Sequence, residues 1–312
     1  AAVVVAPLVL WLLAVDRRRG LVLAATVGLL AGGTALLLDR ASGGWFHYYA
    51  FDVARRHPID PGLLWTFAVR DLGRPLGIAG VIVAAAVAGR ASRPAHDVLG
   101  FHGALLVGLL GSSWQLRLYR GGYDNVLLTA YAGVALATGI AWAGLAASAR
   151  HGRTGRRLAT GVATALLLQF ALLWWNPRAQ VPTSADRAAG ERLVDQLHAL
   201  PGRAFVSSHS YLAARAGRPP HAHVMPFMDV VKGASGPVES TLLRSLRDTL
   251  SAHAYPVLIM DSRDWLLDEA RRAGYVVRAR VFPASDVFWP VTGMRTRPEF
   301  ILTVQGVEDS LR

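Results

Sequence analysis

Six long apolar blocks in the first 175 residues constrain the fold of this chain more than any other feature. A helix needs about 20 residues to cross the roughly 30 Å of hydrocarbon in a bilayer. The blocks cover residues 1–15, 21–38, 76–88, 98–114, 126–147 and 158–175, and no such block follows Asn176. We therefore predict a polytopic α-helical membrane domain of about six spans over residues 1–178, followed by an extracytoplasmic domain over residues 179–312.

The charges between the blocks predict the orientation. Short loops at residues 16–20, 89–97 and 148–157 are rich in arginine, and such loops stay in the cytoplasm. The stretches 39–74 and 115–125, and everything after Asn176, then lie outside. The bias toward arginine, alanine and glycine suggests a GC-rich bacterial genome. We expect a multi-pass protein of the bacterial cytoplasmic (inner) membrane.

Composition excludes several other classes of protein. The chain is 53% hydrophobic and only 17% charged, which is wrong for a soluble protein of this length. Its net charge of +12 resembles that of a nucleic-acid binder, but Lys232 is the only lysine, and arginine-rich membrane loops explain the sign. We expect no nucleic-acid partner. The chain has no cysteine, which excludes disulfides and thiolate metal sites. Because it begins inside an apolar run without a methionine, we expect further spans to precede it.

The first outer stretch, "GGWFHYYAFDVARRHPIDPG", crowds five aromatic residues ahead of Arg55 and Arg56. Aromatic side chains of this kind settle at the headgroup level, and such a helix lies flat on the bilayer. One interpretation is an interfacial anchor. The other is a wall of a lipid-substrate groove in which Arg55 or Arg56 faces a phosphate.

The second outer stretch, "RLYRGGYDN", is a polar turn between two apolar blocks. Two glycines permit a tight return to the membrane, and either Asp124 or Asn125 is a suitable cap for the helix that follows. The free N–H groups at that helix start, together with nearby arginines, would form an anion site. A plain capped turn is the alternative. The phosphate-binding interpretation uses Arg117, Arg120, Tyr123, Asp124 and Asn125.

The acidic residues of the membrane half place any chemistry at its outer face. We expect none of them in the middle of a span, which argues against an ion-coupled transporter. Five lie on the predicted outer side: Asp39, Asp52, Asp60, Asp71 and Asp124. Asp52 and Asp124 have polar neighbours, so they are the local candidates for a catalytic base.

The C-terminal domain alternates between helix and strand patterns. Helices are predicted at 185–200, 240–253 and 263–273, and strands at "RAFVSSHS", "PVLIMDS", "YVVRARVF" and "EFILTVQG". This order favours an α/β sandwich with a largely parallel sheet. Sites in such sheets gather beyond the carboxyl ends of the strands, here at Ser207–His209 and Asp261–Ser262. The chain has no GxGxxG or Walker motif, so nucleotide binding has no support.

A histidine-rich loop follows the first of these strands. His209, His221, His223 and Asp229 are possible metal ligands, although the His-x-His pair has no firm third ligand, so we predict no structural zinc there. A loop that packs against the membrane domain is the second interpretation. The third is a substrate-facing loop that carries His209, Tyr211, His221 and His223.

Together, the spans, the aromatic outer stretch, the "GGYDNVLLTAYAG" turn and the "SSHSYLAARAGRPPHAH" segment resemble bacterial GT-C glycosyltransferases. The resemblance is to the C-terminal portion of members near the protein-mannosyltransferase and aminoarabinose-transferase group. It implies transfer of a sugar from a polyprenyl-phosphate donor to a glycan, lipid or protein acceptor at the outer membrane face.

The same resemblance implies an aspartate in the first outer loop as the catalytic residue, and that loop would lie upstream of this chain. It also places Arg120, Tyr123, Asp124 and Asn125 near the donor. Many relatives use a divalent metal and others do not. Two alternatives stay open: a membrane-anchored binding or assembly protein whose outer domain recruits a partner, and a transporter or flippase.

Overall fold

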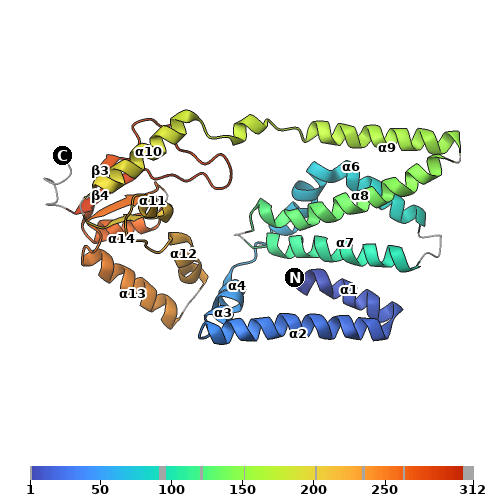
Figure 1. Cartoon of the computed structure of the whole chain (residues 1–312), viewed down its shortest axis with the longest axis horizontal. Helices are drawn as coiled ribbons and strands as arrows, with labels where there is room; N and C mark the ends of the chain where they lie inside the picture. Colours follow the sequence, from blue (N-terminus) through green and yellow to red (C-terminus); the bar gives the residue numbers. More distant parts are fainter. Residues whose placement is uncertain are drawn as a thin grey trace. The chain divides into compact units, whose positions relative to one another are not determined.

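The computed structural model of the chain describes residues 2–90, 96–119, 122–150, 152–200, 202–233, 236–262 and 264–304. It divides into two compact units, Ala1–Trp175 and Asn176–Arg312, close to the predicted domain boundary between residues 178 and 179. We call them the first and the second unit, and each is described by itself (Figure 1).

The first unit is helical, and each of the six apolar blocks lies in a helix. These are α1 (Ala2–Val15), α2 (Arg17–Ala41), α6 (Arg74–Arg90), α7 (His96–Arg117), α8 (Leu128–Ala149) and α9 (Arg153–Leu172). Between α2 and α6 the chain forms short helices and two π-helical segments. These are α3 (Trp45–His47), η1 (Tyr48–Val53), α4 (Ala54–Arg56), α5 (Leu63–Thr66) and η2 (Phe67–Gly73), and the short 3-10 helix η3 (Asp124–Leu127) precedes α8.

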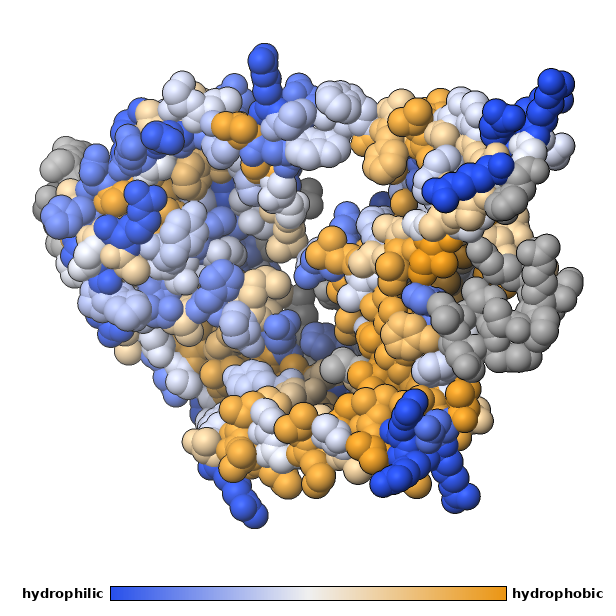
Figure 2. Space-filling view, turned by 45° about the vertical axis from the view of Figure 1, so that its right-hand side comes forward, coloured by the Kyte–Doolittle hydropathy of each residue, from blue (hydrophilic) through white to orange (hydrophobic). Residues whose placement is uncertain are grey.

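Within the described residues, three helices are long and apolar enough to cross a membrane: Arg17–Ala41, Leu63–Ala88 and Asp124–Ala147. A fourth is added if a bent pair that begins with α9 counts as one span. Figure 2 shows apolar side chains gathered over the helices of this unit. These findings support a membrane-associated protein. The prediction of about six spans is thus confirmed only in part, since α1, for example, has 14 residues.

Small residues let the helices of the first unit approach closely. A Cβ added at Gly108 of α7 would lie 2.4 Å from the carbonyl oxygen of Val4, and one at Gly100 would lie 2.2 Å from the indole nitrogen of Trp11. Close approach at small residues is a common way for membrane helices to associate, because lipid supplies no hydrophobic driving force between them. The α1–α7 contact therefore depends on these glycines.

The second unit combines helices with a sheet, which has four strands in the described part of the chain. Its helices are η4 (Pro177–Gln180), α10 (Ser184–Ala199), α11 (Ser210–Arg215), α12 (Val224–Gly233), α13 (Pro237–Ser251) and α14 (Leu266–Arg272). Its strands are β1 (Ala204–Val206), β2 (Val257–Met260), β3 (Tyr275–Arg280) and β4 (Phe300–Val304). The four strands, α10, α13 and α14 lie where the sequence predicts them, whereas η4, α11 and α12 are additional helices.

The sheet is mixed, so the prediction of a largely parallel sheet is wrong. Its order is β1-β2-β4-β3, with β1 and β2 parallel and β4 antiparallel to both β2 and β3. The helical connections do give β1, β2 and β3 one common direction. The last strand, however, follows β3 through a loop rather than a crossover helix, and it inserts between β2 and β3 in the opposite direction.

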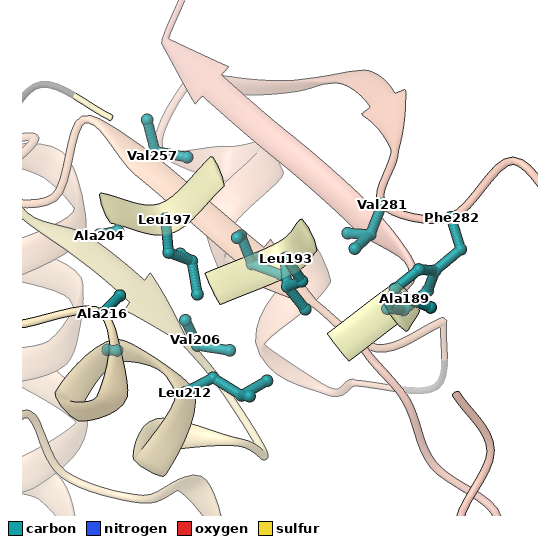
Figure 3. Packing of buried hydrophobic residues seen from close by; sticks show 12 residues of the cluster. Ala189, Leu193, Leu197, Ala204, Val206, Leu212, Ala216, Val257, Val281 and Phe282 are labelled. Carbon is teal, nitrogen blue, oxygen red and sulfur yellow. The ribbon is translucent and has the colours of Figure 1, made fainter. Parts of the chain in front are cut away.

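The sheet lies between two layers of helices, because alternate residues of its strands face opposite sides. One apolar cluster joins α10 and α11 to Val206, Val257 and Ile259 (Figure 3). The other joins α12, α13 and α14 to Leu258, Met260 and Leu302. The predicted α/β sandwich is therefore present, with β2 buried along its whole length.

Candidate functional site

The first unit contains a cavity of about 650 Å³ between η2, the start of α6, and the facing parts of η3, α8 and α9. This volume lies within the range of about 300–1,000 Å³ usual for small-molecule sites. The cavity is lined by Arg70, Asp71, Gly73, Arg74, Pro75, Gly77, Ile78, Asp124, Leu127, Tyr131, Gln169, Leu172 and Leu173. Its wall therefore combines charged side chains with an apolar remainder.

A buried ion pair supports one side of the cavity: Asp71 lines the cavity, and its partner Arg117 lies behind it. Arg117, in the last turn of α7, donates from Nε to Oδ2 of Asp71 at 2.7 Å and from Nη2 to Oδ1 at 3.2 Å. The side chains of Arg117 and Asp71 are only 12% and 5% exposed. Bidentate pairs of this kind are strong and fix geometry. Tyr131 of α8 adds a hydrogen bond from its hydroxyl to the carbonyl oxygen of Asp71 at 3.0 Å.

The π-helical segment η2 places Asp71 in this position. Such segments occur mostly as single turns, frequently at functional sites. Beyond it, α6 is kinked at Leu76, whose φ and ψ are −122° and 16°, directly after Pro75, which disrupts helical hydrogen bonding. The N–H of Ala79, in the turn after the kink, instead donates to Oε1 of the buried Gln169 of α9 at 3.0 Å. A polar side chain thus stabilises the bent wall of the cavity.

The cavity has a net positive charge, because Arg70, Arg74 and the adjacent Arg117 outnumber the two carboxylates of the wall, Asp71 and Asp124. Arg70 and Arg74 are exposed at its edge, and within the described parts of the chain neither has an ion-pair or hydrogen-bond partner. Arg117 is already neutralised by Asp71. Asp124, 92% exposed and 3.5 Å from Nη2 of Arg117, is the other carboxylate of the wall. The arrangement suits an anion that also has apolar parts.

Of the residues in the predicted donor-binding turn, only some of those that the structure describes lie at this cavity. Arg120 lies outside the described residues. Of the described turn residues, Asp124 lines the cavity, whereas Tyr123 and Asn125 are exposed but are not part of its lining. Arg117 lies next to it, with its guanidinium bonded to Asp71 and to the carbonyl oxygen of Gly122. Direct contact of these residues with a phosphate stays a prediction.

One detail of that turn is corrected. The expectation that Asp124 or Asn125 caps the next helix is wrong, since the capping position falls on Tyr123, without a side-chain hydrogen bond. The chain enters α8 through the short 3-10 helix η3 instead. Asp124 therefore has its carboxylate directed to Arg117 rather than to backbone N–H groups.

The residues of the aromatic outer stretch lie elsewhere. Arg55 and Arg56 are exposed on α4, and neither belongs to the cavity lining. Asp52 is 3.8 Å from Nε2 of His47 and is also absent from that lining. Of the two candidate bases, the cavity thus includes Asp124 alone.

Asp71 is the functional residue that the sequence reasoning missed. It was expected among outer-loop acids, but it is buried inside the candidate span Leu63–Ala88. Asp71 lies in the first third of this candidate span rather than in a loop, so the expected outer loop ends earlier than residue 74. An acid this close to an apolar block is costly in lipid unless it has a partner, which is the signal that the sequence offers.

In the second unit, the histidine-rich loop divides into two parts. His221 accepts a hydrogen bond at Nε2 from the N–H of Val206, at 3.0 Å, and its Nδ1 is 3.1 Å from the carbonyl oxygen of Ala222. Its ring lies against Phe205, and burial lowers its pKa. Both ring nitrogens have contacts within the protein, so His221 covers the free edge of β1, and its contact with a substrate stays a prediction.

His223 has a comparable contact. Its Nδ1 accepts a hydrogen bond from the N–H of Met225 at the start of α12, at 3.0 Å, and its ring borders an apolar pocket of about 190 Å³. For His223, contact with a substrate stays a prediction. In the described part of the chain, no group of three or more His, Asp or Glu side chains is arranged to hold a metal ion.

His209 and Tyr211, by contrast, line a pocket of about 360 Å³ in this unit. The other lining residues are Pro182, Asp186, Arg187, Phe288, Trp289, Pro290, Met294 and Thr296. Nε2 of His209 faces Oδ1 of Asp261 at 3.5 Å, and Ser207 donates to Asp264, whose pKa is raised by burial. The carboxyl ends of β1 and β2 thus bring together the polar residues that the sequence placed there.

Comparisons of the chain with protein-family models, with curated proteins and with solved structures found no match. The function of the protein is therefore inferred from the cavity of the first unit and the pocket of the second unit.

Proposed function

We propose that the protein is a membrane glycosyltransferase that moves a sugar from a polyprenyl-phosphate donor to an acceptor at the outer face of the bacterial cytoplasmic membrane. The observation that carries the proposal is the cavity of the first unit. It lies among apolar helices, and Arg70 and Arg74 at its edge have no described anionic partner. A lipid-linked phosphate has the matching chemistry, with a negative charge attached to a long apolar chain.

The residues around the cavity suit the steps of such a transfer. When the bond between sugar and phosphate breaks, negative charge develops on the departing phosphate, and fixed cations stabilise it. Arg70 and Arg74 supply this charge, while the Asp71–Arg117 pair fixes the wall behind them. Asp124 is the exposed carboxylate in position to accept the acceptor's proton.

The proposal includes the membrane arrangement predicted from the arginine-rich loops. All six long helices cross the bilayer, and the second unit lies outside the cytoplasm. The turn residues Arg120, Tyr123 and Asn125 then lie at headgroup depth and add contacts to the donor. Arg55 and Arg56 are the competing site for the phosphate, at the interfacial stretch.

Binding of undecaprenyl phosphate to the purified full-length protein in nanodiscs tests the proposal and separates the two sites. An arginine contact to a phosphate is worth about 1.5–3 kcal/mol, and every 1.4 kcal/mol is about tenfold in affinity. We therefore expect Arg70→Gln and Arg74→Gln each to weaken binding about tenfold to a hundredfold, and the double variant to weaken it by about a hundredfold or more. Arg55→Gln with Arg56→Gln should leave binding within about twofold. Arg120→Ala is expected to weaken it less than the Arg70/Arg74 double variant.

The neutral alcohol undecaprenol is the matched ligand control. Equal binding of the alcohol and the phosphate would refute a phosphate site, and a loss confined to the Arg55/Arg56 variant would move the site to the interfacial stretch. Transfer of labelled mannose or arabinose from the polyprenyl phosphate to membrane acceptors then tests catalysis. Donor binding without transfer of either sugar would favour a binding or assembly protein.

A transporter or flippase is the second candidate, because a buried ion pair within a candidate span is characteristic of translocation pathways. Asp71, paired with Arg117, is such a group. Reconstituted liposomes that move undecaprenyl phosphate between leaflets, with loss of movement in Asp71→Asn, would support this function over transfer.

A further inference from the structure

The loop between β3 and β4 contains a strained residue. Phe288 has a φ of +60°, in the left-handed region that side chains other than glycine rarely adopt. Such a conformation is unfavourable and persists only where the surrounding structure holds it, often at binding sites. Contacts with neighbouring residues must therefore stabilise Phe288 in this conformation.

Two residues of α10 hold it. Oδ1 of Asp186 accepts a hydrogen bond from the N–H of Phe288 at 2.7 Å, and Oδ2 accepts from Thr183 at the start of the helix. These bonds lower the pKa of Asp186. Gly190, one turn further on, leaves room for the ring, because an added Cβ would lie 2.5 Å from Cε2 of Phe288.

The buried Arg297 fixes the rest of the loop. It is 5% exposed, and its Nη1 donates to the carbonyl oxygens of Ala284 and Val287. Its guanidinium also lies 4.4 Å from the ring centre of Trp289, and the indole N–H of Trp289 donates to the carbonyl oxygen of Ser285 at 2.9 Å. The ring of Trp289 is thus held in place before any ligand arrives.

The product of these contacts is the 360 Å³ pocket, with aromatic and polar walls. Trp289 and Phe288 come from the loop, and Tyr211 comes from α11, with 54% of its surface exposed. Arg187 and His209 add hydrogen-bonding groups. Behind His209, Oδ2 of Asp261 is buried without a hydrogen-bond partner among the described residues, so this end of the pocket retains unused polar capacity.

We propose that this pocket binds a carbohydrate. A sugar ring has an apolar C–H face, which suits an exposed aromatic ring, and a rim of hydroxyl groups, which suits arginine and histidine. The size of the pocket fits a mono- or disaccharide. Asp186, the acidic group in the lining, already accepts hydrogen bonds from Phe288 and Thr183 with its two oxygens, and Arg187 lies beside it in the lining with the opposite charge. Binding here does not depend on transfer activity in the first unit.

Saturation-transfer NMR with mannose, arabinose and N-acetylglucosamine tests the proposal on the purified full-length protein in nanodiscs, since common glycoside detergents would compete. We expect at least one of these sugars to bind. Tyr211→Ala should weaken its binding about tenfold or more, whereas Tyr211→Phe, which keeps the ring, should bind within about threefold of wild type. Trp174→Ala removes an exposed aromatic side chain of the first unit and should bind as wild type.

Gly190→Ala gives an independent reading, because it displaces Phe288 without touching the pocket surface directly. We expect it to weaken sugar binding severalfold while Trp174→Ala does not. Failure of all three sugars to bind wild type would overturn the proposal, as would wild-type binding by Tyr211→Ala. Loss of undecaprenyl phosphate binding in Arg70→Gln with Arg74→Gln, with sugar binding intact, would show that the two sites are separate.

Discussion

The two units differ in which residues they bury. In the first unit, large apolar side chains face outward, among them Leu29, Phe170 and Leu172 at 76%, 71% and 73% exposure. Its buried groups include Asp71, Ser113 and Gln169. The second unit buries leucines such as Leu193 and Leu197 at 1% and 0% exposure, as water-soluble domains do.

The difference changes the meaning of a buried polar group. In the second unit, water competes for polar groups near the surface, so a half-buried histidine such as His221 serves as a cap for a strand edge. Lipid offers no such competition, and a polar group there needs a protein partner. The Asp71–Arg117 pair is therefore expected to affect the protein more strongly than any comparable contact of the second unit.

The largest expected effect comes from Asp71→Ala. It leaves Arg117 buried without its partner, and breaking a buried pair from one side costs about 3–5 kcal/mol. We expect the largest fall in melting temperature of any variant discussed, measured on the purified protein in nanodiscs.

Two further variants make this prediction specific. Asp124→Ala removes a carboxylate that is 92% exposed and should change stability by less than about 0.5 kcal/mol. Asp71→Leu combined with Arg117→Met removes both charges and should recover part of the loss. If Asp71→Ala melts like wild type, the ion pair does not stabilise the first unit, and the contrast between the units fails.

Gly190→Ala should have an intermediate effect. Alanine favours a helix over glycine by about 1 kcal/mol, yet the new Cβ would collide with Phe288, and overpacking costs about 1–3 kcal/mol. We expect net destabilisation by about 1 kcal/mol. Gly139 of α8 has nothing within 4 Å of an added Cβ, so Gly139→Ala should be neutral or stabilising. Equal behaviour of the two variants in thermal unfolding would contradict the close packing of Phe288 on α10.

The smallest effect concerns pH. Burial lowers the pKa of His221 below its usual 6.5, so the folded chain keeps this ring neutral while the unfolded chain takes up a proton. Its contribution to stability is present above about pH 6.5 and is lost as the pH falls through the range below it. Solvent screening keeps the effect below about 1 kcal/mol.

Amide exchange of the segment 204–206 measures this locally. We expect protection at Val206 to fall between pH 7 and pH 5, after correction for the intrinsic exchange rate. His221→Gln keeps an acceptor for the Val206 N–H without the titration, so it should show a flatter profile. A fall of the same size in both proteins would assign the acid sensitivity to another group.

The local sequence pattern predicted most of the helices and strands, whereas contacts between residues far apart in the sequence determine which side chains form the two sites. Apolar blocks located the six long helices, and short apolar runs located all four strands. The antiparallel insertion of β4 was missed because strand order is not encoded by any local pattern. Asp71 and Arg117 are 46 residues apart in the sequence, so the residues around either one do not reveal that the two side chains form an ion pair.

The second unit shows the same limit on a smaller scale. His209 and Tyr211 were predicted to face a ligand, and they do line a pocket. His221 looked equivalent in sequence, but its partner, the Val206 N–H, lies 15 residues away on a strand edge. The left-handed conformation of Phe288 had no sequence signal, because glycine or asparagine is the usual residue there.

The geometry of the cavity in the first unit depends on the number of residues in the π-helical segment η2, which precedes α6. A π-helical turn contains one residue more than an α-helical turn, so removing a single residue from Phe67–Gly73 would leave helix on both flanks. It would also turn the side chains on one flank by about 100° relative to the other. In such a variant, the ion pair between Asp71 and Arg117 and the present positions of Arg70 and Arg74 could not both be kept. For a homologous chain to keep this cavity, the spacing of this segment therefore matters as much as the identity of the aspartate.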